Sequence, residues 1–237
     1  MMIQFLEWDS SFFEKKIGRF ECDRLTMIEL DTFIKEKSTQ SYDLVYLFTN
    51  NIEKEVDNYL KKGGIHVMDH KVTYAINGEF QASPECDFIE PYQGYLTKDL
   101  LNLALLSGHE SRFNKDPLLN PKFNILYSQW IEKSLSGQLA DLVFVAKNAK
   151  RITGFVTVKK NNKEGQIGLI AVDPAFHGQG IGSLLIQTAH NWYSENKLTR
   201  ATVVTQLTNK GACRLYETMG YHQETTKLIF HINNKLL

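Results

Sequence analysis

Residues 172–183 have the sequence VDPAFHGQGIGS, and this stretch decides the fold. A strand is predicted over residues 166–172. Pro174 follows it and leads into a turn with glycine at positions 178, 180 and 182. The turn opens into residues 180–196, where apolar side chains recur at helical spacing along one face. Because such a helix must bury that face, the sequence predicts an α/β protein with helices packed on a mixed sheet.

The glycine-rich turn is also a predicted phosphate-binding loop. The first turn of a helix leaves about four backbone N–H groups unbonded and carries a partial positive charge. Glycine lets an anion approach these groups closely. Two other phosphate loops do not fit: no lysine follows the glycines as a P-loop requires, and Ser183 stands where a dinucleotide fingerprint has its third glycine.

A second motif, NKGACRLYETMGY, occupies residues 209–221. Together with HGQGIG at residues 177–182, it resembles the paired motifs of the GCN5-related N-acetyltransferase (GNAT) superfamily. Those motifs are Q/R-x-x-G-x-G/A and N-x-x-A-x-x-F/L-Y-x-x-x-G-F/Y, in the same order. His177 departs from the first motif, which usually has Gln or Arg there. His177 is expected either to tune phosphate affinity or to be an exposed turn residue.

The resemblance implies the GNAT fold, a mixed central sheet that splays into a V with helices on its flanks. It places acetyl-CoA as co-substrate where the strands predicted over residues 166–172 and 200–207 separate, with no metal. The residues expected to bind acetyl-CoA are Ile170, Ala171, Val172, His177, Gly178, Gln179, Gly180, Ile181, Gly182, Ser183 and Asn209.

The resemblance also implies catalytic groups. Tyr216 matches the tyrosine with which many members protonate the departing CoA thiolate, and the Val172 N–H is the expected oxyanion donor. Tyr216 also belongs to an apolar helical stripe, so a purely structural role stays open. The general base is open too, because Gln166 stands where some relatives have Glu. The alternatives are a water relay, Glu164, His177, His222 and His231.

Three further segments resemble TDP-fucosamine acetyltransferases, which acetylate a nucleotide-linked amino-deoxy sugar. They are LEWDSSFFEKKIG at 6–18, SRFNKDP at 111–117 with LYSQWI at 126–131, and Thr205-Gln206. The resemblance implies an acceptor of the dTDP-4-amino-4,6-dideoxyhexose type and a homodimer. Arg112 suits a diphosphate, Phe113 a flat base, and Thr205 a sugar hydroxyl. Alternatively, Arg112 pairs with Asp116 at the surface and Phe113 caps the core.

Two other functions compete with this reading. One is an N-acetyltransferase for proteins, peptides or small amines; for polyamines, acidic binding residues would be expected, whereas residues 107–121 hold equal numbers of acidic and basic side chains. The other is a noncatalytic acyl-CoA-binding protein, against which the presence of Tyr216 argues.

Composition limits the partners. Lys plus Arg and Asp plus Glu both number 27, so no net charge favours nucleic acid. Cys22, Cys86 and Cys213 are too few and too widely spaced for a disulfide framework or zinc cluster, and we expect buried thiols. Glu7 and Asp9 interrupt any N-terminal apolar run, and no later segment has the length of a membrane span. We therefore expect a cytoplasmic protein.

The hydrophobic pattern of the sequence divides the chain into two parts. Residues 1–85 alternate short strand-like and helix-like runs, which predicts a small N-terminal α/β domain. Periodicity breaks over residues 77–87, and residues 86–237 carry both motifs, which predicts the GNAT acetyltransferase domain.

Overall fold

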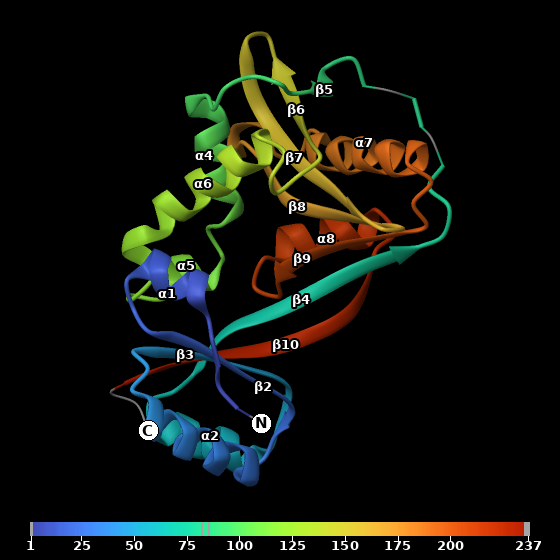
Figure 1. The fold of residues 1–237 in the computed structure, drawn as a ribbon. Helices are drawn as coiled ribbons and strands as arrows, with labels where there is room; N and C mark the ends of the chain where they lie inside the picture. The colour runs from blue at the N-terminus through green and yellow to red at the C-terminus, as the bar shows by residue number, and fades with distance from the viewer. Residues whose placement is uncertain (1, 82, 85, 235–237) are drawn as a thin grey trace.

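Ten strands form one mixed sheet that runs through the whole molecule (Figure 1). The structure is a computed structural model and describes residues 2–81, 83–84 and 86–234. The strand order is β1-β2-β3-β10-β4-β9-β8-β7-β6-β5. Both parallel and antiparallel pairs occur, so the mixed sheet predicted from the sequence is confirmed.

The elements follow one another with short connections. The strands are β1 (Gln4–Phe5), β2 (Ile17–Leu25), β3 (Leu44–Ile52), β4 (Val67–Asn77), β5 (Ile89–Pro91), β6 (Leu142–Asn148), β7 (Arg151–Asn161), β8 (Glu164–Val172), β9 (Arg200–Gln206) and β10 (His222–Asn233). The α-helices are α1 (Glu7–Phe13), α2 (Met27–Gln40), α3 (Lys54–Lys62), α4 (Lys98–Ser107), α5 (Arg112–Lys115), α6 (Phe123–Leu135), α7 (Ile181–Glu195) and α8 (Lys210–Thr218). Two 3-10 turns, η1 (Asn120–Lys122) and η2 (Pro174–Phe176), precede α6 and α7.

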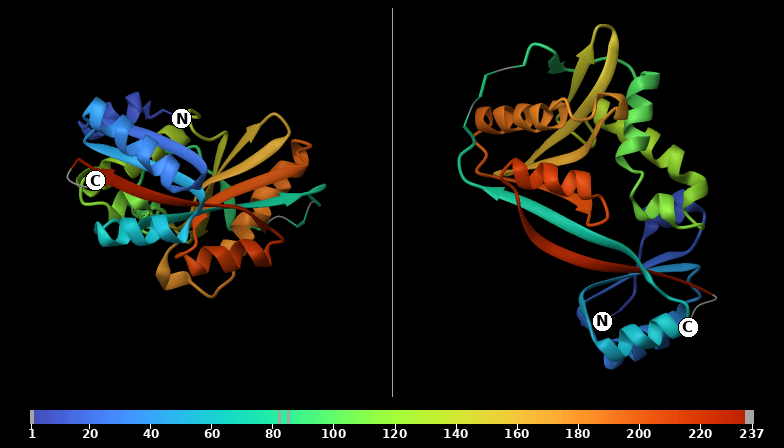
Figure 2. Two further views of the ribbon diagram at one scale, coloured as in Figure 1. Left: turned by 90° about the horizontal axis from the view of Figure 1, so that it is seen from below. Right: turned by 180° about the vertical axis from the view of Figure 1, so that it is seen from behind.

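The C-terminal strand joins the two halves of the chain. β10 lies between β3 and β4 and is antiparallel to both, and β4 pairs on its other side with β9. The right view of Figure 2 shows β4 and β10 side by side across the middle of the molecule, between the part that carries α7 and α8 and the part that carries α2. The boundary predicted at residue 85 lies outside the described residues. The division into 1–85 and 86–237 stays a prediction, and the sheet is continuous across it.

Helices cover both faces of β6, β7 and β8. In β6, Val143 and Val145 pack with α4, while Phe144 and Ala146 pack on the opposite face with α7. Because successive side chains of a strand alternate between faces, an uninterrupted apolar strand such as β6 must be covered on both sides. α7 is the amphipathic helix predicted over residues 180–196.

The sheet opens between β8 and β9. The two strands are parallel neighbours only from Glu164 to Ile167, opposite Arg200 to Val203. Beyond this point they separate, which confirms the predicted V. The gap faces the start of α7, so the fold brings the glycine-rich loop to the opening of the sheet.

Two remaining predictions concern thiols and membranes. Cys22 and Cys213 are buried and Cys86 is half-buried, and all three are free. Within the described residues, no helix has the length and apolar character needed to cross a membrane.

Candidate functional site

The glycine-rich loop adopts the conformation that an anion site requires. Gly178 and Gly180 have φ of 76° and 77°, in the left-handed region, and a side chain at either position would point into open space. The first bond of α7 runs from the Leu184 N–H to the Gly180 carbonyl at 3.1 Å. The N–H groups of Ile181, Gly182 and Ser183 therefore precede the helical ladder and can bind a phosphate.

The edge of β8 next to this loop is an unpaired strand edge. Asp173 N–H bonds the Thr153 carbonyl at 2.8 Å, while Val172 stands opposite Gly154 and Ile170 opposite Val156. In an antiparallel ladder the bonded pairs alternate, so the Ile170 and Val172 polar groups face away from β7 and into the gap. An extended ligand with amide groups can pair with this edge as an additional strand.

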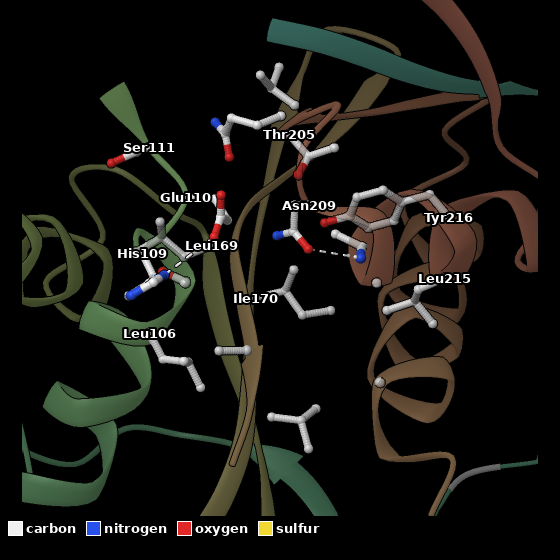
Figure 3. A pocket seen from close by; sticks show the side chains of 18 of the residues that line it. Leu106, His109, Glu110, Ser111, Leu169, Ile170, Thr205, Asn209, Leu215 and Tyr216 are labelled. Atoms are coloured by element: carbon white, nitrogen blue, oxygen red, sulfur yellow. Dashed lines mark hydrogen bonds and ion pairs between the residues drawn. The ribbon is translucent and has the colours of Figure 1, made fainter. Parts of the chain in front are cut away.

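α8 forms one wall of the opening. Asn209 caps this helix by accepting the Ala212 N–H at 3.1 Å, so its carboxamide is fixed at the mouth of the gap. The Tyr216 ring is buried, and its hydroxyl points toward the cleft (Figure 3). Burial, followed by the nearby Cys213, raises the pKa of Tyr216 well above its usual value. The phenol is therefore protonated at neutral pH, as a proton donor must be.

A cleft of about 890 Å³ extends from this gap toward the N-terminal half of the chain. In Figure 3, Leu106, His109 and Glu110 lie on the wall opposite Tyr216, with Ile170 between the two walls. Of the predicted acetyl-CoA residues, all but Gln179 line the cleft, as do Tyr216, Arg112, Phe113 and Thr205. The structure thus brings together residues that are far apart in the sequence, while their individual roles stay predictions.

Arg112 lies at the far end of the cleft, where a buried pair holds it. Its Nη1 is 3.2 Å from Nε2 of His231, and Nδ1 of His231 bonds the Asp116 carboxylate. Burial lowers the pKa of His231 to about 4. The ring is therefore neutral, donates Nδ1–H to Asp116 and accepts from Arg112. The sequence left open a direct ion pair between Arg112 and Asp116 at the surface as the alternative to a ligand-binding role. This pair is not formed, because Asp116 pairs with His231 instead.

Phe113 and Thr205 differ in how freely they face the cleft. The Phe113 ring packs against Phe13 and Trp130, with centroids 6.0 and 5.7 Å away, and the Arg112 guanidinium lies 4.4 Å from its centroid. These contacts support the alternative in which Phe113 belongs to the core. Thr205 is buried on β9 at the gap.

Three of the four candidate bases, Glu164, His177 and His231, are engaged in other interactions. Glu164 binds Arg200 at 3.0 Å and the Thr202 hydroxyl at 2.8 Å, at the closed end of the V. His177 donates Nε2–H to the Val172 carbonyl at 2.9 Å. His231 belongs to the pair that holds Arg112.

Sequence reasoning missed an acid in the cleft. Asp69 on β4 lines the cleft and is 8% exposed, and burial raises its pKa to about 6, although the charges of Arg112, Lys115 and Lys71 oppose this shift. A carboxylate with such a pKa can take up a proton near neutral pH. Its sequence context, a single acid in a β-branched run, carries no signal, because only the pairing of β4 with β9 and β10 brings it to the cleft.

The sequence pattern of the acetyltransferase (GNAT) family matches residues 109–221, which include the loop, β8, β9 and α8. Residues 109–221 belong to the GNAT acetyltransferase family. The GNAT fold extends over most of the chain, because a GCN5-related N-acetyltransferase from Sphaerobacter thermophilus aligns with a TM-score of 0.54, at 15% identity, over 86% of this chain and 65% of that one. A conserved protein of unknown function from Staphylococcus epidermidis has a similar fold, with a TM-score of 0.68, at 16% identity, over 98% of this chain and 90% of that one.

Curated proteins of several kinds are similar in sequence to this chain. SpsD, a spore coat polysaccharide biosynthesis protein of Bacillus subtilis, is 31% identical over 137 residues, 57% of this chain and 47% of SpsD. The dTDP-fucosamine acetyltransferase of Escherichia coli is 31% identical over 129 residues, 54% of this chain and 55% of that protein. Human N-alpha-acetyltransferase 30 is 28% identical over 97 residues, 39% of this chain and 27% of that protein. The chain thus spans about half the length of the first two relatives.

The site of this chain fits acetyl-CoA. The left-handed loop with open space at Gly178 and Gly180 suits the pyrophosphate, and the strand edge at Ile170, together with the Val172 N–H, suits the amides of the pantetheine arm. Within the described residues there is no group of His, Cys, Asp and Glu side chains that could hold a metal ion.

Proposed function

We propose that this protein is an acetyl-CoA-dependent N-acetyltransferase whose acceptor is the amine of a nucleotide-linked amino-deoxy sugar. The observation that carries the proposal is the continuity of the cleft. A GNAT coenzyme site at one end opens into a compartment with Arg112, Lys71 and Arg19 at the other. Two relatives support this acceptor class: SpsD is named as a polysaccharide biosynthesis protein, and the Escherichia coli relative is named as a dTDP-fucosamine acetyltransferase.

Acetyl-CoA supplies the acetyl group as an activated thioester. The acceptor nitrogen forms a bond to the acetyl carbon, and the carbon–sulfur bond breaks. The Val172 N–H, which faces the gap, donates to the oxygen on which negative charge develops. Tyr216 gives its phenolic proton to the leaving sulfur, and Asp69 takes the proton that the acceptor amine releases.

The charge of the cleft supports a phosphorylated acceptor over a polyamine. Polyamines need several unpaired carboxylates, whereas the cleft is lined by three basic side chains, Arg19, Lys71 and Arg112, and by two acids, of which Glu110 forms an ion pair with Lys115 and Asp69 is buried. The likeness to N-alpha-acetyltransferase 30 keeps peptide N-termini as a second acceptor class. A cytoplasmic location and a homodimer stay predictions.

One experiment tests the proposed function directly. The protein is incubated with acetyl-CoA and, separately, with dTDP-4-amino-4,6-dideoxyhexoses, peptides with free N-termini and polyamines, and thiol release is followed. We expect the amino-sugar nucleotide to give the highest kcat/KM. A higher kcat/KM with peptides would assign the protein to the second acceptor class. If none of the acceptors caused thiol release, both acceptor classes would be contradicted.

A further inference from the structure

The far end of the cleft is built on the N-terminal half of the sheet. Strand register places Lys71 on β4 opposite Gln206 on β9 and, on its other side, opposite Lys227 on β10. Side chains at paired positions share one face of a sheet. Lys71 therefore lies on the cleft face, one strand away from the gap between β8 and β9.

Positive charge is in excess on this face. Glu21 forms ion pairs with both Arg19 and Lys227. In the described part of the chain, neither Lys71 nor Arg112 has a carboxylate within ion-pair distance. Burial and then the charges of Arg19, Arg112 and Lys227 lower the pKa of Lys71, and the charge of Asp69 opposes this shift without reversing it. Half-buried cations that repel one another cost stability, and a bound anion removes this cost.

Arg112 is fixed in orientation before any ligand arrives. Its guanidinium carbon lies 4.0 Å from the Tyr46 ring centroid, and its Nη1 is held by His231, which Asp116 holds in turn. Both His231 and Asp116 are buried. A guanidinium ordered in this way loses little conformational entropy when it binds a planar or branched anion with its remaining N–H groups.

We propose that Lys71 and Arg112 together form the subsite for the diphosphate of the acceptor, with His231 and Asp116 as the positioning residues for Arg112. This inference rests on the proposed function. Two negative charges on the diphosphate match the two unpaired cations. In a 4-amino-4,6-dideoxyhexose nucleotide, the anomeric phosphate and the amine lie at opposite ends of the sugar ring.

The test compares acceptors with and without the diphosphate. KM is measured for a dTDP-4-amino-4,6-dideoxyhexose and for the same amino sugar as its methyl glycoside, in the wild-type protein and in Lys71→Met. Lys227→Met is the matched control, because it removes an equal charge from the paired position on β10 but Lys227 does not line the cleft. Lys71→Arg keeps the charge, and dTDP affinity measured by calorimetry gives a readout independent of turnover.

The expected result is selective. Lys71→Met should raise the KM for the nucleotide sugar and the Kd for dTDP about 10- to 100-fold, the range for losing a hydrogen bond to a charged group. The KM for the methyl glycoside should not change. Lys227→Met should change each value less than about threefold, as expected for a screened charge without contact. Lys71→Arg should stay close to wild type.

Several outcomes would overturn the subsite. They are an unchanged nucleotide-sugar KM in Lys71→Met, an equal loss in Lys227→Met, or an equal loss for the methyl glycoside. Tighter binding of an acidic peptide than of dTDP would also overturn it. Failure of the proposed function looks different, because the wild-type protein would then turn over neither form of the amino sugar.

Discussion

The ring of His177 donates a hydrogen bond from Nε2 to the backbone carbonyl of Val172, 2.9 Å away. This bond ties the start of the glycine-rich loop back to the last residue of β8. It occupies a carbonyl that points into the gap and leaves the Val172 N–H free. His177 therefore shapes the loop. This role differs from both alternatives predicted from the sequence, which were the tuning of phosphate affinity and an exposed turn residue.

His177→Leu should weaken CoA binding. Loss of one neutral hydrogen bond costs about 0.5–1.5 kcal/mol, which corresponds to about a two- to tenfold higher Kd. His177→Gln, whose amide can donate to the same carbonyl, should retain most of the affinity. Isothermal titration with CoA measures both. A leucine variant that binds as tightly as the wild type would exclude the His177–Val172 bond as a determinant of the loop.

Gly180→Val should abolish detectable CoA binding. At φ 77° a β-branched residue costs about 1–2 kcal/mol, and its side chain would project from the backbone that the pyrophosphate approaches. Gly137→Val is the matched control, because Gly137 has φ 78° and equally open surroundings but lies outside the cleft. Calorimetry should show normal CoA affinity in Gly137→Val. Equal loss in both variants would mean that backbone strain, rather than the phosphate site, explains the effect.

Local signals in the sequence predicted the coenzyme half of the site. Asn209 is the N-cap that accepts the Ala212 N–H, and the glycines of the loop carry their own conformational requirement. These features depend on residues within one turn of each other, so the sequence alone specifies them. The unpaired edge of β8 arises instead where β9 separates from it.

Long-range pairing explains what the sequence did not predict. The sheet is completed by β10 between β3 and β4, strands that are more than one hundred residues earlier in the chain. Asp69 and Lys71 reach the cleft only through this pairing, and nothing in their neighbours distinguishes them from other strand residues. The individual bounds of α1, β2 and α2 were also not predicted, since α2 has only weak apolar periodicity.

Tyr216→Phe should lower kcat about 10- to 1000-fold and leave the KM for acetyl-CoA almost unchanged. The substitution removes only the proton donor to the leaving sulfur. Tyr221→Phe is the control, because that buried phenol bonds His190 at 3.1 Å and does not line the cleft. Steady-state kinetics with both variants separates the two roles. A Tyr216→Phe variant with wild-type turnover would leave Tyr216 as a core residue.

Asp69→Asn should remove one limb of the pH profile. With a pKa of about 6, the Asp69 carboxylate loses its charge as the pH falls through 6, so wild-type kcat/KM should fall in that range. The amide of the variant has no such transition, and its kcat should be about 10- to 100-fold lower with little change at acid pH. The measurement is kcat/KM between pH 5 and 8 with the preferred acceptor. If kcat/KM of Asp69→Asn fell at acid pH in the same way as that of the wild type, this fall would be due to a group other than Asp69.

His190→Gln should reduce the loss of stability at acid pH. His190 is buried against Phe80 and Tyr221, and burial lowers its pKa to about 4. In the unfolded chain a histidine has a pKa of about 6.5, so the unfolded state takes up the proton first as the pH falls. The stabilisation is complete above pH 6.5 and is lost progressively toward pH 4. Urea unfolding at pH 7 and pH 5 should give a difference about 2 kcal/mol smaller in the variant. His231, which is still present, keeps part of the pH dependence, so an identical difference in both proteins would show that His190 does not contribute to it.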